Sequence, residues 1–166
     1  MNVLYGLISL SELLKEQQGD GSYTFSGIAQ KSFSGIKESQ GDEAALLELS
    51  NRIIHNLNLT ENIIEFLPKV GITHYRISSS IFSLICDFSN GLNISVDSLP
   101  NHSSILNKIR SIGVIARQNN ITLSVYPDSS NSLITEDEVS LNRTIQELNF
   151  HSWFFETAGF PSNAAN

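Results

Sequence analysis

The sequence predicts an α/β fold built around a parallel sheet. Short runs of strand-forming residues at 3–10, 72–78 and 119–127 alternate with longer segments whose apolar residues recur at helical spacing. The resulting order is β-α-β-α-β-α, and strands separated by helices pair in parallel through right-handed crossovers. With 166 residues, 40 % of them hydrophobic, the chain is long enough for one domain with a core.

The first strand, VLYGLISL, is apolar but has no basic segment before it and no small-residue cleavage site after it, so we interpret it as a strand and not as a signal peptide. Residues 17–42 are rich in Gly, Ser and Gln and are expected to form a long polar loop, with at most a little local structure.

Three helices are expected between and after the strands. The first covers 42–70, where Thr60 either caps a second segment or lies within one continuous helix. The second is predicted by a single apolar stripe made of Ile105, Ile109, Ile112 and Ala116. The third covers 135–159, with Thr135 and Glu138 spaced as a capping box and Gly159 placed to end it.

Polar side chains end the second strand, which reads GITHYRISSS from 71 to 80. Active sites of parallel α/β proteins lie at the carboxyl ends of the strands, where Arg76 could bind a phosphate or carboxylate through its planar guanidinium group. The alternative is structural: Ser78, Ser79 and Ser80 satisfy backbone groups of the loop, and Arg76 pairs with a neighbouring carboxylate.

Composition limits the functional classes. The net charge is −7 with only 10 Lys and Arg, so any contact with DNA must come from a local site. The single cysteine, Cys86, excludes a disulfide framework and a four-cysteine zinc site and suits a reducing compartment. No apolar run is long enough to span a membrane. We therefore expect an intracellular, cytoplasmic protein that is not secreted.

Several segments resemble the UV damage endonuclease family in the family's own order. GITHYRISSSIFSL is similar to its second strand, which reads roughly Ile-x-x-Tyr-Arg-x-Ser-Ser. LYGLISL resembles its opening strand, ILNKIRSIGVIARQNNITLSVYP its next helix and third strand, and EVSLNRTIQELNFHSWFFETAG the helix that follows. His151 matches the histidine of a Tyr-His pair in that helix, and we expect it to have a packing or helix-terminal role.

The resemblance implies a TIM-type barrel and a metal-dependent DNA-repair enzyme. Members nick damaged double-stranded DNA on the 5′ side of UV photoproducts and use several divalent ions, typically manganese, at the strand ends. Such ions generate hydroxide, hold the phosphate and neutralise the leaving oxygen. By this resemblance Arg76, Ser78, Ser79, Tyr126 and Pro127 occupy the family's strand-mouth positions.

The third strand departs from the family pattern, His-Pro-x-Gln followed by an aromatic residue. Tyr126 stands where the metal-binding histidine is expected, and only Pro127 is retained. Ser129 and Ser130 stand where two residues would probe the DNA lesion, although serine cannot stack as an aromatic wedge. Asp87 lies near a further ligand position; it is either a hard-metal ligand or a solvated loop aspartate.

A complete barrel has eight strand–helix units in ~250 residues, and the sequence supplies about three. We expect residues 1–166 to form one partial barrel domain that does not incise DNA by itself, because the family's later metal ligands lie on strands not found here. The alternative is a non-catalytic module whose open sheet edge pairs with another polypeptide or with an identical copy. A weaker alternative is another enzyme of this barrel class, such as a sugar isomerase-like protein.

Overall fold

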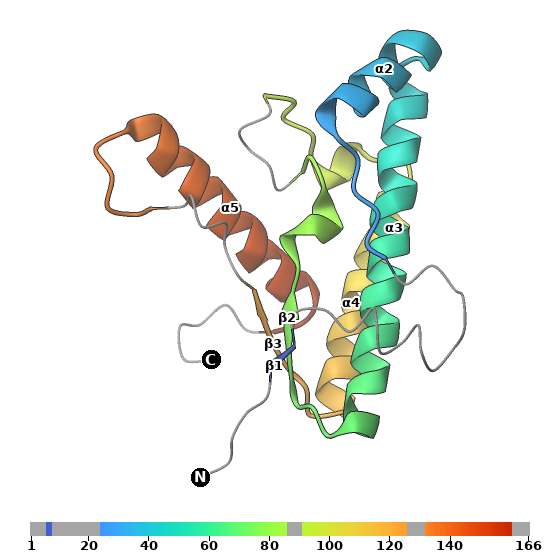
Figure 1. The fold of residues 1–166 in the computed structure, drawn as a ribbon, viewed down its shortest axis with the longest axis vertical. Helices are drawn as coiled ribbons and strands as arrows, with labels where there is room; N and C mark the ends of the chain where they lie inside the picture. The colour runs from blue at the N-terminus through green and yellow to red at the C-terminus, as the bar shows by residue number, and fades with distance from the viewer. Residues whose placement is uncertain (1–5, 8–23, 86–90, 126–131, 161–166) are drawn as a thin grey trace.

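The computed structural model describes residues 6–7, 24–85, 91–125 and 132–160 of the chain, and Figure 1 shows their arrangement. The strands are β1 (Gly6–Leu7), β2 (His74–Ile77) and β3 (Thr122–Val125). The helices are α2 (Gln30–Gln40), α3 (Asp42–Phe66), α4 (His102–Gln118) and α5 (Glu138–Thr157). Short 3₁₀ turns are η1 (Leu67–Val70), η2 (Ser79–Phe82) and η3 (Val96–Ser98).

The three strands form one parallel sheet in the order β1-β2-β3. Tyr75 of β2 is in register with Leu7 and Leu123, while Arg76 is in register with Ser124. The predicted α/β fold with a parallel sheet is therefore confirmed. Because both pairings are parallel, the carboxyl ends of all described strands lie at the same edge of the sheet.

The expected loop over 17–42 is wrong in its second half, because Gln30–Gln40 form α2. Phe33 is buried in the core and Ile36 packs against the core, so the helix is stabilised by apolar contacts that the polar composition conceals. Gly41, with φ of 94°, turns the chain directly from α2 into α3, a conformation that favours glycine. Residues 17–23 lie outside the described residues.

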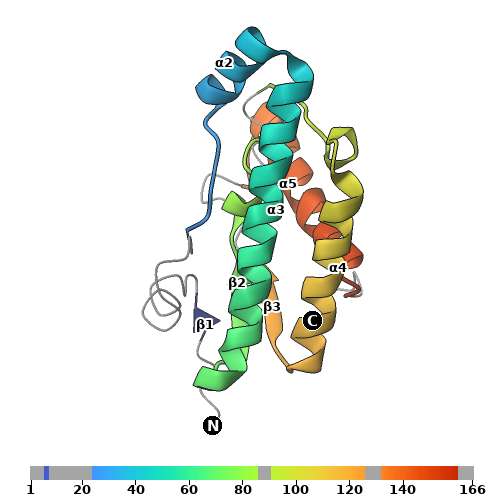
Figure 2. The ribbon, with the colours of Figure 1, turned by 90° about the vertical axis from the view of Figure 1, so that its right-hand side faces the viewer.

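α3 runs without a break from Asp42 to Phe66, so Thr60 does not cap a second segment. The Thr60 hydroxyl instead donates to the carbonyl of Asn56 one turn earlier, at 2.9 Å. α3 and α4 lie side by side in both Figures 1 and 2. The whole predicted stripe of α4 is buried, as expected of an amphipathic helix that packs on a core: Ile105, Ile109, Ile112 and Ala116.

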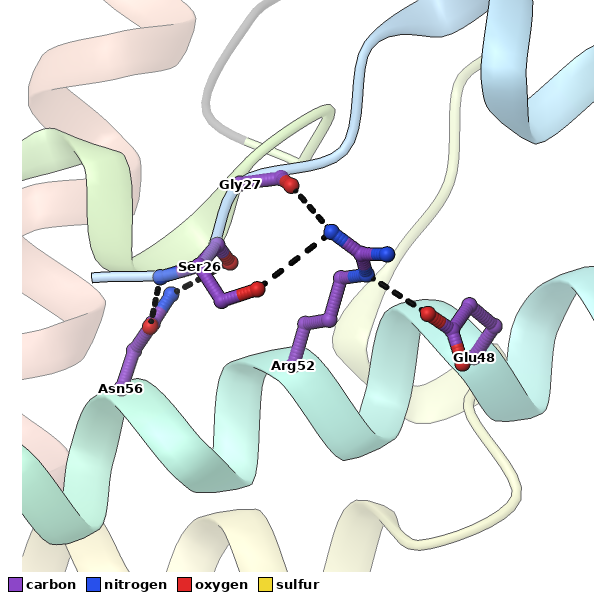
Figure 3. Close-up of polar contacts among 5 residues, drawn as sticks. All are labelled: Ser26, Gly27, Glu48, Arg52 and Asn56. Atoms are coloured by element: carbon purple, nitrogen blue, oxygen red, sulfur yellow. Dashed lines mark hydrogen bonds and ion pairs between the residues drawn. The ribbon is translucent and has the colours of Figure 1, made fainter. Parts of the chain in front are cut away.

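Side chains of α3 hold the segment that precedes α2 (Figure 3). The carboxamide of Asn56 accepts a hydrogen bond from the backbone nitrogen of Ser26 at 2.7 Å and donates to the Ser26 carbonyl at 3.1 Å. Arg52 donates to the Gly27 carbonyl at 2.5 Å and to Glu48 at 2.7 Å. Residues 26–27 are thus fixed against α3 by polar contacts as well as by the burial of Ile28.

α5 begins at Glu138, and its N-cap is Asp137, so the predicted Thr135–Glu138 capping box is wrong. The Asp137 carboxylate accepts from the backbone nitrogens of Val139 and Ser140, both at 3.2 Å. Hydrogen bonds from Ser140 and Val139 lower the pKa of Asp137 because they favour the ionised form. Thr135 accepts instead from the nitrogen of Asp137, one position outside the helix.

The predicted end of α5 is confirmed, since Gly159 follows the helix with φ of 80°. Arg117 of α4 donates to the carbonyls of Ala158 and Gly159, at 2.8 and 3.0 Å, and so binds the end of α5 to α4. In the parts of the chain that the structure describes, every helix is too short or too polar to cross a lipid bilayer.

Candidate functional site

The side chains of β2 alternate between two environments. Tyr75 and Ile77 are buried and belong to the core, whereas His74 and Arg76 are half-buried. Successive residues of a strand point to opposite faces of the sheet, so His74 and Arg76 share the face that is turned away from this core. Arg76 is the next-to-last residue of the strand, close to its carboxyl end.

β3 adds a third polar side chain to this face. Ser124 is the register partner of Arg76, and its hydroxyl lies 2.8 Å from Nε2 of His74. His74, Arg76 and Ser124 therefore form a half-buried polar row across two strands, which we call the sheet-face row. Its groups are a guanidinium cation, an imidazole and a hydroxyl, a set suited to binding an anionic oxygen.

The strand pattern predicts Arg76 at this edge but not Ser124 as its neighbour. The signal was present in ITLSV, where Thr122 and Ser124 alternate with apolar residues as on a half-buried strand. The same hydroxyl of Ser124 gives the His74 ring a hydrogen-bond partner at Nε2. The pairing joins residues 50 positions apart, and it depends on the register between the two strands.

The serines after β2 form a capped turn. Ser78 is the N-cap of η2, and its hydroxyl accepts from the nitrogen of Ser80 at 3.3 Å and lies 2.6 Å from the Ser80 hydroxyl. Asn56 of α3 donates to the carbonyls of Ser80 and Ile81, at 3.4 and 3.2 Å. Ser79 is exposed at the start of the turn. α3 thereby fixes the conformation of the chain where it leaves the carboxyl edge of the sheet.

The other predicted site positions lie outside the described residues. Tyr126 and Pro127 directly follow the last residue of β3, and Ser129 and Ser130 come shortly after them. Asp87 follows the described segment that ends at 85. Their assignment as metal-binding or DNA-probing positions stays a prediction from the resemblance.

The described residues do not by themselves fit a manganese centre. Among them, no three His, Cys, Asp or Glu side chains are grouped so that they could hold a metal ion. In the sheet-face row, the partner of the His74 ring is a serine hydroxyl, and the carboxylates of a hard-metal site are not part of that row.

His151, which matches the family's histidine, lies on α5 and is 8 % exposed. Its Nε2 is 3.4 Å from Oε1 of the equally buried Glu147, one turn earlier. Burial lowers the pKa of His151, and the hydrogen bond and charge of Glu147 oppose that shift only in part. The imidazole is thus predominantly neutral near pH 7, and the pair acts as a buried hydrogen bond in the helix packing.

Tyr75 is fully buried beside the sheet-face row, and its hydroxyl has no hydrogen-bond partner among the described residues. Burial raises the pKa of Tyr75 above its ordinary value of 10.0. A folded-state pKa above the unfolded value means that the unfolded state releases its proton first, so stability is retained below about pH 10 and lost as the pH rises further.

We expect the free energy of unfolding to fall by about 1.4 kcal/mol more in the native chain than in Tyr75→Phe when the pH rises from 8 to about 11. At pH 8 the two should differ little, since the substitution removes a buried hydroxyl without leaving a partner unpaired. Urea unfolding at both pH values measures the difference. Parallel alkaline losses in the two proteins would show that Tyr75 ionises without unfolding.

Two comparisons with known proteins find similarity over nearly the whole chain. A family model described as UV-endonuclease UvdE matches residues 4–165. The crystal structure of SacUVDE superposes with a TM-score of 0.69 and 21 % sequence identity over 96 % of this chain. The match covers 47 % of the SacUVDE chain, so this chain spans about half the length of that structure. A search of curated protein sequences finds no match.

Proposed function

Because this chain belongs to the UV-endonuclease UvdE family, we propose that it takes part in DNA repair by binding damaged double-stranded DNA at the carboxyl edge of its sheet. The observation that carries the proposal is the family match over residues 4–165. The arrangement of Arg76 on the sheet-face row and of Ser78 and Ser79 in the following turn supports it, since each could contact a phosphate oxygen. The remaining strand-mouth positions would be Tyr126 and Pro127.

We further propose that this chain alone does not incise DNA. Tyrosine at 126 is a poor substitute for an imidazole ligand, because its hydroxyl must lose a proton with a pKa of about 10 before it binds a metal ion well. The fold relative SacUVDE is about twice as long, so the remainder of a complete metal site would have to come from other strands. Manganese, the metal expected from the family resemblance, would then be held only in a more complete assembly.

Substitution of Arg76 tests the DNA-binding proposal. One lost phosphate contact lowers the slope of log Kd against log salt by about 0.9 and weakens binding roughly tenfold at ~50 mM salt. We therefore expect Arg76→Ala to show this loss with a duplex that carries a UV photoproduct. Fluorescence anisotropy of the labelled duplex over a range of salt concentrations measures both quantities.

Arg110→Ala is the matched control, because Arg110 is exposed on α4, where its guanidinium group donates to Asn107 of the same helix at 3.1 Å. This substitution also removes one positive charge, but at a position away from the carboxyl edge of the sheet. It should therefore change the affinity for the duplex little. Equal losses in the two variants would mean that DNA responds only to net charge, which would contradict a site at Arg76. Nicking of UV-irradiated plasmid with Mn²⁺, abolished by Arg76→Ala, would refute the proposed inactivity of the isolated chain.

A second candidate function is assembly through the sheet edge. In the described part of the chain β3 is an outer strand of the sheet; its Thr122 is exposed, and the rest of the strand, up to Val125, is half-buried. An outer strand offers backbone donors and acceptors to a further strand from a second polypeptide or an identical copy. Light scattering over a wide concentration range tests self-association, and a constant monomer mass would exclude the identical copy as the partner.

A further inference from the structure

A cavity of about 450 Å³ lies between the segment that follows η2 and the middle of α5. Its size falls within the ~300–1,000 Å³ typical of small-molecule sites. It shares no lining residue with the sheet-face row. The described lining comes from residues 84–85, from residues 93–97 and from one face of α5: Leu84, Ile85, Asn93, Ile94, Ser95, Val96, Asp97, Gln146, Asn149, Phe150 and Trp153.

The cavity has an apolar interior and a polar rim. Leu84, Ile85 and Val96 are buried, and the rings of Phe150 and Trp153 are half-buried between core and solvent. The rim consists of exposed amide and hydroxyl side chains that can both donate and accept hydrogen bonds: Asn93, Ser95, Gln146 and Asn149. An apolar body with a hydrogen-bonding edge fits such a surface.

Among the described residues of the lining, Asp97 is the one that carries a charge, and its carboxylate is exposed at the rim. None of the described lining residues has a cationic side chain that would balance it. A ligand with a phosphate or carboxylate group would meet uncompensated negative charge, whereas a cation would find a partner. The cavity and the sheet-face row therefore favour ligands of different charge, since Arg76 of the sheet-face row favours anions.

Two residues of the cavity lining have an unusual backbone conformation. Leu84 has φ of 64° and Asn93 has φ of 48°, which makes them two of the three non-glycine residues with positive φ in the described chain. Asparagine tolerates this region, but leucine rarely adopts it unless the surrounding structure imposes it. Such strain tends to cluster at ligand sites, so it is a second observation that points to the same place.

Aromatic packing fixes the position of the Trp153 ring. The ring of Phe82 contacts those of Phe150 and Trp153 edge-on, with centroids 5.1 and 6.4 Å apart. Phe150 and Trp153 are themselves 5.2 Å apart and tilted. Two preordered aromatic rings beside an open volume offer a stacking surface for a flat ligand at little entropic cost.

We propose that this cavity binds a small planar aromatic ligand that is neutral or cationic and carries an amide- or amidine-like edge. The aromatic body stacks on Phe150 and Trp153, and the edge exchanges hydrogen bonds with the amides of the rim. A cationic group gains the attraction of Asp97. The site goes beyond the proposed role in DNA repair, since its charge disfavours a phosphate backbone.

Trp153 makes the proposal directly measurable, because it is the one tryptophan of the chain and gives a single indole N–H resonance. Benzamidine, benzamide and benzoate have the same planar shape but carry positive, zero and negative charge. We expect millimolar benzamidine and benzamide to shift the Trp153 resonance, with benzoate bound at least about threefold more weakly than benzamidine because of one exposed charge. No shift with any of the three, or equal affinity for all, would overturn the proposal.

Two pairs of variants locate the binding. Gln146→Phe fills the cavity and should abolish the shifts, whereas Asn142→Phe, one turn earlier on the exposed surface of α5 and outside the lining, should leave them unchanged. Asp97→Asn should remove the discrimination between benzamidine and benzoate, whereas Glu65→Gln, the same charge change on α3, should keep it. Shifts that survive Gln146→Phe, or discrimination that survives Asp97→Asn, would refute this site.

Discussion

Replacing Asn56 with alanine is expected to lower the free energy of unfolding by about 2–4 kcal/mol. Asn56 is fully buried, and its carboxamide exchanges hydrogen bonds with the backbone of Ser26 and donates to the carbonyls of Ser80 and Ile81. Alanine would leave the carbonyl of the buried Ile81 unpaired, which costs about 1–3 kcal/mol, and would also remove the hydrogen bonds to the half-buried Ser26 and the exposed Ser80. Urea unfolding followed by circular dichroism measures the loss.

Asn58→Ala is the matched control, because Asn58 lies on the exposed face of the same helix and the change removes the same side chain. It should alter stability by less than about 0.5 kcal/mol. Asn56→Asp separates hydrogen bonding from packing, since it keeps the shape and the acceptor for Ser26 but loses the donor to three carbonyls. If Asn56→Asp were as stable as the native chain, the donor bonds would not matter and our account of this residue would be wrong.

The consequence of Asn56 for the candidate site is positional. Its carboxamide joins the segment at 26–27 and the turn at 80–81 to α3, although these three segments are about 25 to 30 residues apart. The turn follows β2 directly, so its position decides where Ser78 and Ser79 lie relative to Arg76. Loss of the Asn56 hydrogen bonds would therefore shift the residues of the proposed DNA contact, although Asn56 is not itself one of them.

The elements of the fold that could be predicted are those specified by local patterns. The apolar stripe of α4 repeats at helical spacing, and all four of its residues are buried in the structure. α2 could not be predicted in the same way, because its Ser, Gln and Gly content favours a loop and its helix depends on burial of Phe33 against distant residues. The N-cap of α5 was predicted at Thr135 and is Asp137 in the structure, because threonine and aspartate are both good N-caps and lie only two positions apart.

The same distinction applies to the candidate site, where some features follow from a local sequence pattern and others depend on contacts between distant segments. The place of Arg76 at the carboxyl end of β2 follows from the strand pattern alone. The contact between His74 and Ser124 does not, since it depends on the register of two strands and a shift of one residue would put Ser124 on the other face. The cavity beside Trp153 was not predicted either, because residues 84–85 and 93–97, which line it together with α5, belong to no α-helix or strand.

Gly113→Ala is expected to separate α4 from α5 and to lower the free energy of unfolding by about 2–3 kcal/mol. A methyl group at Gly113 would lie 1.8 Å from the carbonyl oxygen of Ala158 and 2.7 Å from its carbonyl carbon. These are backbone atoms, and Arg117 holds the same oxygen with a hydrogen bond of 2.8 Å, so the end of α5 cannot yield without losing that bond. The clash outweighs the gain of about 1 kcal/mol that alanine normally brings to a helix.

Gly35→Ala provides a control with the opposite expected sign. Gly35 lies within α2, and a methyl group there would have no atom within 4 Å. Alanine should therefore stabilise the chain by up to about 1 kcal/mol through helix propensity alone. Thermal and urea unfolding of the two variants separate propensity from packing. If Gly113→Ala were stabilising as well, helix propensity would dominate at both sites and the close approach of α4 to Ala158 would not limit the fold.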